Sequence, residues 1–220
     1  MVIWADSQAE AQADVVQAGG AARGLAAVVA ALGWAALALQ LVLISEALGA
    51  GLGAWRFIGY FTILTNIGAA TVASAVALGS TKRIGGARAR LMAATSIALV
   101  GLTYSIALRS LWNPEGLQKL ADFGLHDVMP LLFLTMWALA PHGSLDRKDF
   151  AWALAPPALY AAYALGRGAI DGWYAYWFLD PGAQGASGLI LSIAVMVAAV
   201  GVLALILIEI DRWKGQGAEV

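Results

Sequence analysis

A threonine and a histidine are the two residues of this chain whose types and positions suggest chemistry. Thr62 and His126 each lie near the start of a long apolar segment. A threonine hydroxyl becomes a useful nucleophile when a neighbouring base takes its proton, and imidazole is the usual base. The sequence therefore predicts Thr62 as a nucleophile and His126 as its base.

Two polar neighbours share the helical face of Thr62. Thr65 and Asn66 follow it by three and four residues, a spacing that puts side chains on one side of an α-helix. This face is expected to point into the protein, because polar groups that face lipid are costly. The alternative for Thr62 is structural, since a threonine in a membrane helix commonly hydrogen-bonds the carbonyl one turn back.

The two aspartates near His126 differ in their expected roles. Asp122 precedes the histidine by four residues and is placed to accept a hydrogen bond from its ring. Asp127 follows directly and points about 100° away, so it is the poorer partner. Pro130 cannot donate to the His126 carbonyl, which loosens the helix there. The alternative is that all three polar residues lie in the wet headgroup region.

An attacked carbonyl develops negative charge and needs hydrogen-bond donors. The candidate donors are the Asn66 amide, the Thr65 hydroxyl and the Tyr104 hydroxyl. Arg109 and Arg167, at outer helix ends, are expected to reach lipid headgroups, and either could hold a carboxylate or phosphate of an amphiphile.

Aromatic residues cluster after the fifth apolar segment, as Trp173, Tyr174, Tyr176, Trp177 and Phe178. Such a run is typical of a belt that anchors an outer loop at the membrane interface. Its other use would be as a lid over a pocket for an acyl chain. His142 lies in a loop with basic residues and is expected to be solvated.

The composition indicates a multi-pass membrane protein. Of 220 residues, 61% are hydrophobic and 12% charged, and the mean hydropathy is +0.76. The absence of cysteine excludes disulfides, thiolate nucleophiles and cysteine-bound metals, and two histidines argue against a zinc site, so no cofactor is expected. A net charge of -1 without clustered basic residues excludes nucleic acid as a partner.

Six apolar stretches are long enough, or nearly so, to cross ~30 Å of hydrocarbon. They lie at about 24–45, 57–79, 91–109, 121–140, 150–167 and 186–209. The sequence thus predicts an all-α fold, a bundle of six transmembrane helices. Thr62 and His126 both fall roughly 8 Å below the outer boundary of such a bundle.

The basic residues set the expected orientation, because lysine and arginine favour cytoplasmic loops. With both termini in the cytoplasm, nine of the thirteen basic residues lie inside. Residues 1–22 are expected to be a polar leader without signal-peptide character, 23–214 a single transmembrane domain and 215–220 a tail. Abundant alanine and glycine favour a bacterial inner membrane.

The chain resembles the androgen-induced gene and androgen-dependent TFPI-regulating protein family of integral membrane proteins, in its bacterial branch. The likeness covers about residues 30–210 and is carried by three segments: Arg56 to Asn66 (RFIGYFTILTN), Leu111 to Pro114 (LWNP) leading to Leu125 to Pro130 (LHDVMP), and Gly172 to Asp180 (GWYAYWFLD). The resemblance implies a hydrolase of fatty acid esters of hydroxy fatty acids, with a threonine nucleophile and a histidine.

By this resemblance the catalytic roles fall on Thr62 and His126. Arg56 lies six residues before Thr62 and nine before Thr65, farther than the basic residue of animal members, so Thr65 remains a rival nucleophile. The residues expected to contact the substrate are Arg109, Trp112, Trp173, Tyr176 and Asp180.

Three functions are therefore open. The first is an intramembrane hydrolase of lipid esters, with lipid or fatty-acid ester substrates and membrane lipids as partners. The second is a lipid-binding or transport protein that performs no chemistry. The third is a structural scaffold, which predicts no enclosed cavity.

Overall fold

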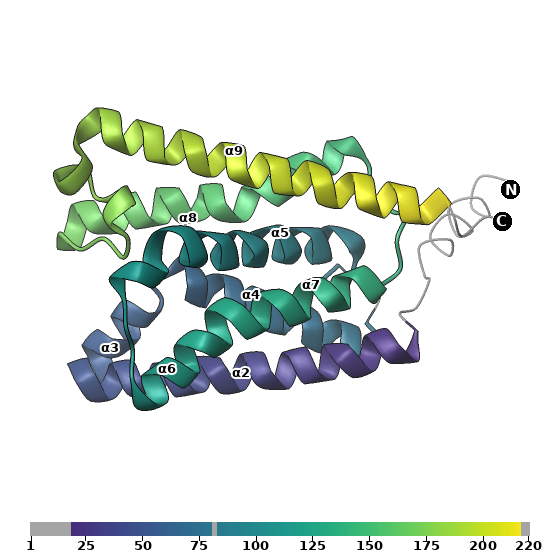
Figure 1. Ribbon diagram of the computed structural model, residues 1–220, viewed down its shortest axis with the longest axis horizontal. Coiled ribbons are helices and arrows are strands. Elements are labelled where there is room, and N and C mark those ends of the chain that lie inside the picture. Colours follow the sequence, from purple (N-terminus) through teal and green to yellow (C-terminus); the bar gives the residue numbers. More distant parts are fainter. Residues whose placement is uncertain (1–18, 81–82, 217–220) are drawn as a thin grey trace, which may run out of the picture.

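The computed structural model describes residues 19–80 and 83–216, and every regular element in them is a helix (Figure 1). The α-helices are α2 (Gly20–Leu48), α3 (Ala50–Phe57), α4 (Phe61–Ala77), α5 (Ala87–Thr103), α6 (Gly116–Phe123), α7 (Met129–Leu139), α8 (Phe150–Asp171) and α9 (Pro181–Gln216). Two π-helices, η1 (Tyr104–Leu108) and η3 (Gly124–Val128), and three 3-10 helices, η2 (Arg109–Leu111), η4 (Arg147–Asp149) and η5 (Trp177–Leu179), complete the set. The predicted all-α class is confirmed.

Several of these helices could cross a membrane. Three are long and apolar enough: α2, the continuous run Ala87–Leu111 that contains α5, and α9. The bent pair α3 and α4 makes a fourth if it is counted as one span. The remaining two predicted spans correspond to α8 and to the divided run α6–η3–α7. The membrane character of the chain is therefore supported by three or four helices.

The predicted domain limits differ at both ends of the bundle. α2 already begins at Gly20, inside the expected polar leader, and residues 1–18 of that leader lie outside the described residues. α9 continues to Gln216, inside the expected tail, and residues 217–220 lie outside the description.

α5 lies in the middle of the bundle, with α8 and α9 on one side and α4 and α7 on the other (Figure 1). α2 covers α4 and α7 from outside. Small residues such as Ala69, Ala73 and Ala94 are fully buried at these contacts, and they let the helix backbones approach closely. Phe133 and Met136 of α7 fill the space between them. This packing holds α4, α5 and α7 in fixed positions around the site.

A sharp break separates α3 from α4, whose axes differ by 76°. Two carbonyl groups freed at this break are satisfied by tyrosines of α8. The Tyr160 hydroxyl donates to the Gly59 carbonyl at 3.0 Å, and the Tyr163 hydroxyl donates to the Ile58 carbonyl at 3.3 Å. The break thereby starts α4 at Phe61, one residue before Thr62.

Proline explains the π-helix that carries His126. Pro130 has no N–H to give to the His126 carbonyl, so the regular bonding of an α-helix cannot continue through this turn. The Met129 N–H instead bonds the Gly124 carbonyl five residues back, as in a π-helix. Insertions of this kind are frequent at functional sites.

A second polar cluster joins the other ends of α7 and α9. His142, which was expected to be solvated, has a side chain only 6% exposed, with its Nδ1 3.0 Å from Asp211 Oδ1 and its Nε2 3.2 Å from the Ala138 carbonyl oxygen. Asp211 also accepts the N–H groups of Gly143 and Leu145 at 3.0 Å. The expectation of a solvated histidine was wrong because α9 continues past the apolar stretch and brings Asp211 to the loop.

Close packing of α3 on α2 gives a test of the fold. A Cβ added at Gly53 would lie 2.7 Å from the Ser45 Cα and 2.9 Å from the Ile44 carbonyl oxygen, both of them backbone atoms. Gly53→Ala should therefore lower the free energy of unfolding by about 1–3 kcal/mol. Gly51→Ala, on the same helix with nothing within 4 Å, should be neutral or slightly stabilising. Equal apparent Tm values of the two variants in detergent would contradict this packing.

Candidate active site

Thr62 and His126 meet, although they come from different helices. Thr62 is the second residue of α4 and is buried, and His126 lies in the middle of η3. The Thr62 hydroxyl oxygen, Oγ1, lies 3.3 Å from Nε2 of His126. The two residues expected at one depth thus form a hydroxyl–imidazole pair.

The contacts of the other ring nitrogen of His126, Nδ1, determine which of the two nitrogens carries the proton of the neutral ring. Nδ1 is 3.0 Å from the backbone carbonyl oxygen of Asp122 and 3.2 Å from its carboxylate Oδ1. Both oxygens only accept hydrogen bonds, so the proton of the neutral ring belongs on Nδ1. Nε2 is then left with its lone pair toward Thr62, in the orientation that a general base needs.

Tyr104 holds Asp122 and His126 together. Its hydroxyl donates to Asp122 Oδ2, and its ring stacks on the imidazole with centroids 4.1 Å apart and 19° between the planes. The sequence interpretation treated Tyr104 as a donor to developing negative charge. In the structure its hydroxyl donates its hydrogen bond to the Asp122 carboxylate instead. The contacts of Tyr104 are therefore those of a positioning residue.

Tyr176 reaches Thr62 from a segment 114 residues later in the chain. Its hydroxyl oxygen accepts the Thr62 backbone N–H at 3.3 Å and lies 3.3 Å from Thr62 Oγ1. That N–H is in the first turn of α4 and has no carbonyl partner within the helix. Because the Tyr176 oxygen accepts there, its own proton can be donated to Thr62 or to an oxyanion beside it.

Asn66 and Thr65 differ from Thr62, because the side-chain hydrogen bond to the His126 imidazole is made by Thr62. Asn66 Nδ2 donates to the Thr62 carbonyl at 2.8 Å and to the Leu125 carbonyl at 3.2 Å, which ties α4 to η3. Both amide protons are thus engaged. Thr65 is buried, and its side chain forms no hydrogen bond with the part of the chain that the structure describes. Of the two candidate nucleophiles, the structure places Thr62 beside His126.

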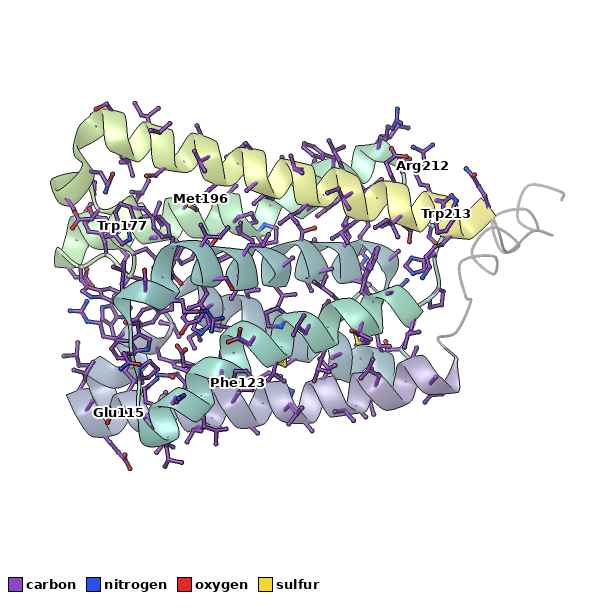
Figure 2. All side chains as sticks on the ribbon, in the orientation of Figure 1. Glu115, Phe123, Trp177, Met196, Arg212 and Trp213 are labelled. Atoms are coloured by element: carbon purple, nitrogen blue, oxygen red, sulfur yellow. The ribbon has the colours of Figure 1, made fainter. Side chains whose placement is uncertain are left out.

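An apolar pocket opens beside Thr62. Its enclosed space is only about 30 Å³, and most of its walls come from α5, α8, η5 and α9. Met196 of α9, labelled in Figure 2, lies in this wall. The other apolar residues that line it include Leu99, Val100, Leu108, Pro157 and Phe178. Its apolar walls suit a hydrocarbon group, but the space is far below that of a ligand pocket, so a lipid chain would enter only if the surrounding helices moved apart.

Arg109 and Asp127 form an ion pair at the edge of the site. Nη2 of Arg109 contacts Oδ1 of Asp127, and the guanidinium carbon lies 4.7 Å from the centroid of the Tyr104 ring. Asp127 was expected to be the poorer partner of His126, and its carboxylate is turned to Arg109 instead. The pair covers Tyr104 from outside.

The remaining predicted substrate contacts are spread more widely. Trp112 is 51% exposed in the loop before α6 and does not line the pocket. Oδ1 of Asp180 accepts the N–H groups of Gly182 and Ala183 at 2.8 and 3.4 Å, which caps the start of α9. Trp173 packs edge-on against Tyr60, with ring centroids 5.4 Å apart. The structure brings Tyr176, but neither Trp112 nor Asp180, into contact with Thr62.

Two features of the site were missed by sequence reasoning. Tyr160 lines the pocket and also supports the break before α4, and Met196 brings α9 into the pocket wall. A tyrosine inside an apolar stretch was a usable signal for the first. The position of Met196 depends on how α9 packs, and no local pattern marks it.

Comparison of the chain with family models, with curated proteins and with solved structures gave no match. Within residues 19–80 and 83–216, no group of three or more His, Cys, Asp or Glu side chains is arranged to hold a metal ion.

Proposed function

We propose that this protein is an intramembrane hydrolase of lipid esters, with Thr62 as nucleophile and His126 as general base. The observation that carries the proposal is the 3.3 Å approach of Thr62 Oγ1 to His126 Nε2 at the end of an apolar pocket. The three segments that resemble the family of fatty acid ester hydrolases support it. Fatty acid esters of hydroxy fatty acids are the substrate class that this resemblance favours.

The reaction would proceed in two steps. In the first, Thr62 Oγ1 attacks the ester carbonyl while its proton passes to His126 Nε2, and the Tyr176 hydroxyl donates to the resulting oxyanion. The C–O bond to the alcohol breaks as His126 returns the proton to the leaving oxygen. In the second, His126 takes a proton from water, whose oxygen attacks the acyl-threonine carbonyl. The bond from the acyl carbon to Thr62 Oγ1 then breaks, His126 returns the proton to Oγ1, and the fatty acid leaves.

The distance between the reacting groups fits an empty site. Direct proton transfer needs about 2.6–3.2 Å, and such contacts are often longer before substrate binds. The 3.3 Å separation therefore requires only a small closure. The Asp122 carboxylate, held by Tyr104, is placed to stabilise the imidazolium that forms.

The proposed setting is a six-span bundle with both termini in the cytoplasm, as in a bacterial inner membrane. α2 begins and α9 ends at the same end of the bundle (Figure 1), which agrees with an even number of crossings. Thr62 and His126 lie toward the opposite end, which by the distribution of basic residues would be the outer leaflet. Substrate would then enter from the lipid.

Trapping of the acyl intermediate tests the proposal. Purified protein incubated with a branched fatty-acid ester and quenched in acid should release the alcohol and carry an acyl group on the peptide that contains Thr62. Mass spectrometry of the digested protein would locate the group. Absence of both turnover and adduct, with intact ester recovered, would exclude the hydrolase.

Narrowing the pocket should change chain-length preference. Met196→Trp adds bulk to the wall, so we expect hydrolysis of a long-chain ester to fall about 10-fold while a butyryl ester is hardly affected. Val197→Trp is the matched control, because the neighbouring Val197 is 55% exposed and points away. Competition between long and short esters measures the ratio of kcat/KM. An unchanged ratio in Met196→Trp would mean that acyl chains bind elsewhere.

Lipid binding without chemistry is the second candidate. Both Asn66 amide protons and the Tyr104 proton are already engaged, which leaves the hydroxyls of Tyr176 and Thr65 as candidate donors, and of these Tyr176 contacts Thr62 Oγ1. A binding protein would retain its lipid without turnover, and Thr62→Ala would not alter that retention.

A further inference from the structure

Two arginines meet around one tryptophan, close to the candidate active site. The Cζ atoms of Arg56, in the last turn of α3, and of Arg167, near the end of α8, lie 4.1 and 5.1 Å from the centroid of the Trp173 ring. Arg167 also lies 4.0 Å from the ring centroid of Trp55. Arg167 was expected to reach lipid headgroups, but it is only 5% exposed. The break before α4 and the loop after α8 enclose it.

This arginine–tryptophan cluster, defined by Arg56, Arg167, Trp55 and Trp173, has more positive than negative charge. The carboxylate that contacts it is Asp171, whose Oδ2 is 3.4 Å from Nε of Arg167. The Trp55 indole N–H, the Trp173 backbone N–H and Arg167 lower the pKa of Asp171, so the carboxylate is ionised and offsets one guanidinium. Within the described ranges no carboxylate oxygen lies within 4.0 Å of the Arg56 guanidinium. One positive charge is left without a counter-ion.

The cluster also has hydrogen-bond donors without acceptors. Nη1 of Arg56 and Nη2 of Arg167 are buried, and neither has a partner in the part of the chain that the structure describes. Stacking on tryptophan covers the faces of a guanidinium, whereas its N–H bonds lie in the plane and need acceptors. A buried donor without an acceptor is costly, and carboxylates and phosphates are the groups that match a guanidinium best.

Tyr60 joins the cluster to the candidate active site. Its ring packs edge-on against Trp173 at 5.4 Å and against Tyr176 at 6.2 Å between centroids. The Tyr176 hydroxyl in turn lies 3.3 Å from Thr62 Oγ1. The two guanidinium groups are therefore separated from the nucleophile by the rings of Trp173, Tyr60 and Tyr176, and half-buried Arg56 and exposed Trp55 lie on the surface side.

We propose that Arg56 and Arg167 bind the anionic headgroup, a carboxylate or a phosphate, of the amphiphile whose hydrocarbon chain occupies the pocket beside Thr62. The proposal rests on the proposed function only for the use of that pocket by a lipid, and it assigns the charged end of the substrate class named above to these two arginines.

Equilibrium binding of oleate and methyl oleate to the purified full-length protein tests the headgroup site. The two ligands share one chain and differ in charge, so wild type should bind oleate at least ~10-fold more tightly. Arg56→Gln and Arg167→Gln should each lose most of this preference while binding methyl oleate as wild type does. Arg147→Gln is the matched control and should keep the preference for oleate, because Arg147 is an exposed arginine of η4 that pairs with Glu209 of α9.

The outcomes separate this proposal from the hydrolase. Oleate contains no ester, so Thr62→Ala should keep the preference for oleate even if hydrolysis is never observed. Competition between lysophosphatidic acid and oleate distinguishes the headgroups. Tighter arginine-dependent binding of lysophosphatidic acid assigns the site to phosphate, and tighter arginine-dependent binding of oleate assigns it to carboxylate. Arg56 is half-buried, so its variant remains informative if Arg167→Gln does not fold. Equal binding of oleate and methyl oleate by wild type, or a preference unchanged in Arg56→Gln, would overturn the headgroup site.

Discussion

Replacement of Thr62 by alanine is expected to abolish ester hydrolysis, with a loss in kcat of at least ~10³-fold. The substitution removes the oxygen that lies 3.3 Å from His126 Nε2 and leaves the apolar pocket intact. His126→Ala should have a similar effect, because the hydroxyl then has no base. Rates would be measured on a fatty acid ester of a hydroxy fatty acid with protein purified in detergent.

Thr65→Ala is the matched control for this experiment. Thr65 lies on the same helix and is as buried as Thr62, but its side chain has no hydrogen bond to His126. We expect Thr65→Ala to keep activity within a few-fold of wild type. If Thr65→Ala were inactive and Thr62→Ala active, the nucleophile would be Thr65. Equal rates in wild type and all three variants would end the enzyme proposal.

Asp122→Asn should lower kcat by about 10²-fold with little change in substrate affinity. The carboxylate contacts Nδ1 of His126, and its charge stabilises the imidazolium of the transition state. The loss should be smaller than that in Thr62→Ala, because the Asp122 backbone carbonyl also holds Nδ1, at 3.0 Å. Steady-state kcat and KM of the purified variant on the same ester would measure the loss, and a change confined to KM would contradict this role.

Asp127→Asn separates a positioning role from a general effect of charge. Asp127 is adjacent to His126 in sequence, but its carboxylate pairs with Arg109. Its neutral variant should keep kcat within a few-fold of wild type. A loss of kcat as large as that in Asp122→Asn would show that the net charge near the site, rather than the Asp122 contact, supports His126.

Composition and helical spacing were enough to predict a helical membrane protein and some of the residues of the candidate active site. Helical spacing placed Thr62 and Asn66 on one buried face, and Asp122 one turn before His126, as the structure has them. Equal depth in two apolar stretches suggested that Thr62, with Thr65 as a rival, lies near His126. These inferences succeed because they depend on the rise and period of a single helix.

Local patterns failed where the helices stop being regular. The sequence did not show that α4 begins at Phe61 after a 76° bend, nor that η3 is a π-helix. Both irregularities change the direction of the side chains that follow, so the choice between Thr62 and Thr65 could not be made from spacing. Tyr176 reaches Thr62 across 114 residues because the loop after α8 folds back over α4.

The sequence by itself determined that the chain is helical, suited to a membrane and carries a hydroxyl and an imidazole in two apolar stretches, because these properties follow from composition and helical period. Only the tertiary structure decided which threonine faces His126, which acceptors take the hydrogen bonds of Tyr104 and Asn66, and that Arg56 and Arg167 lie around Trp173. These facts depend on contacts between distant segments, which helix breaks and packing determine together.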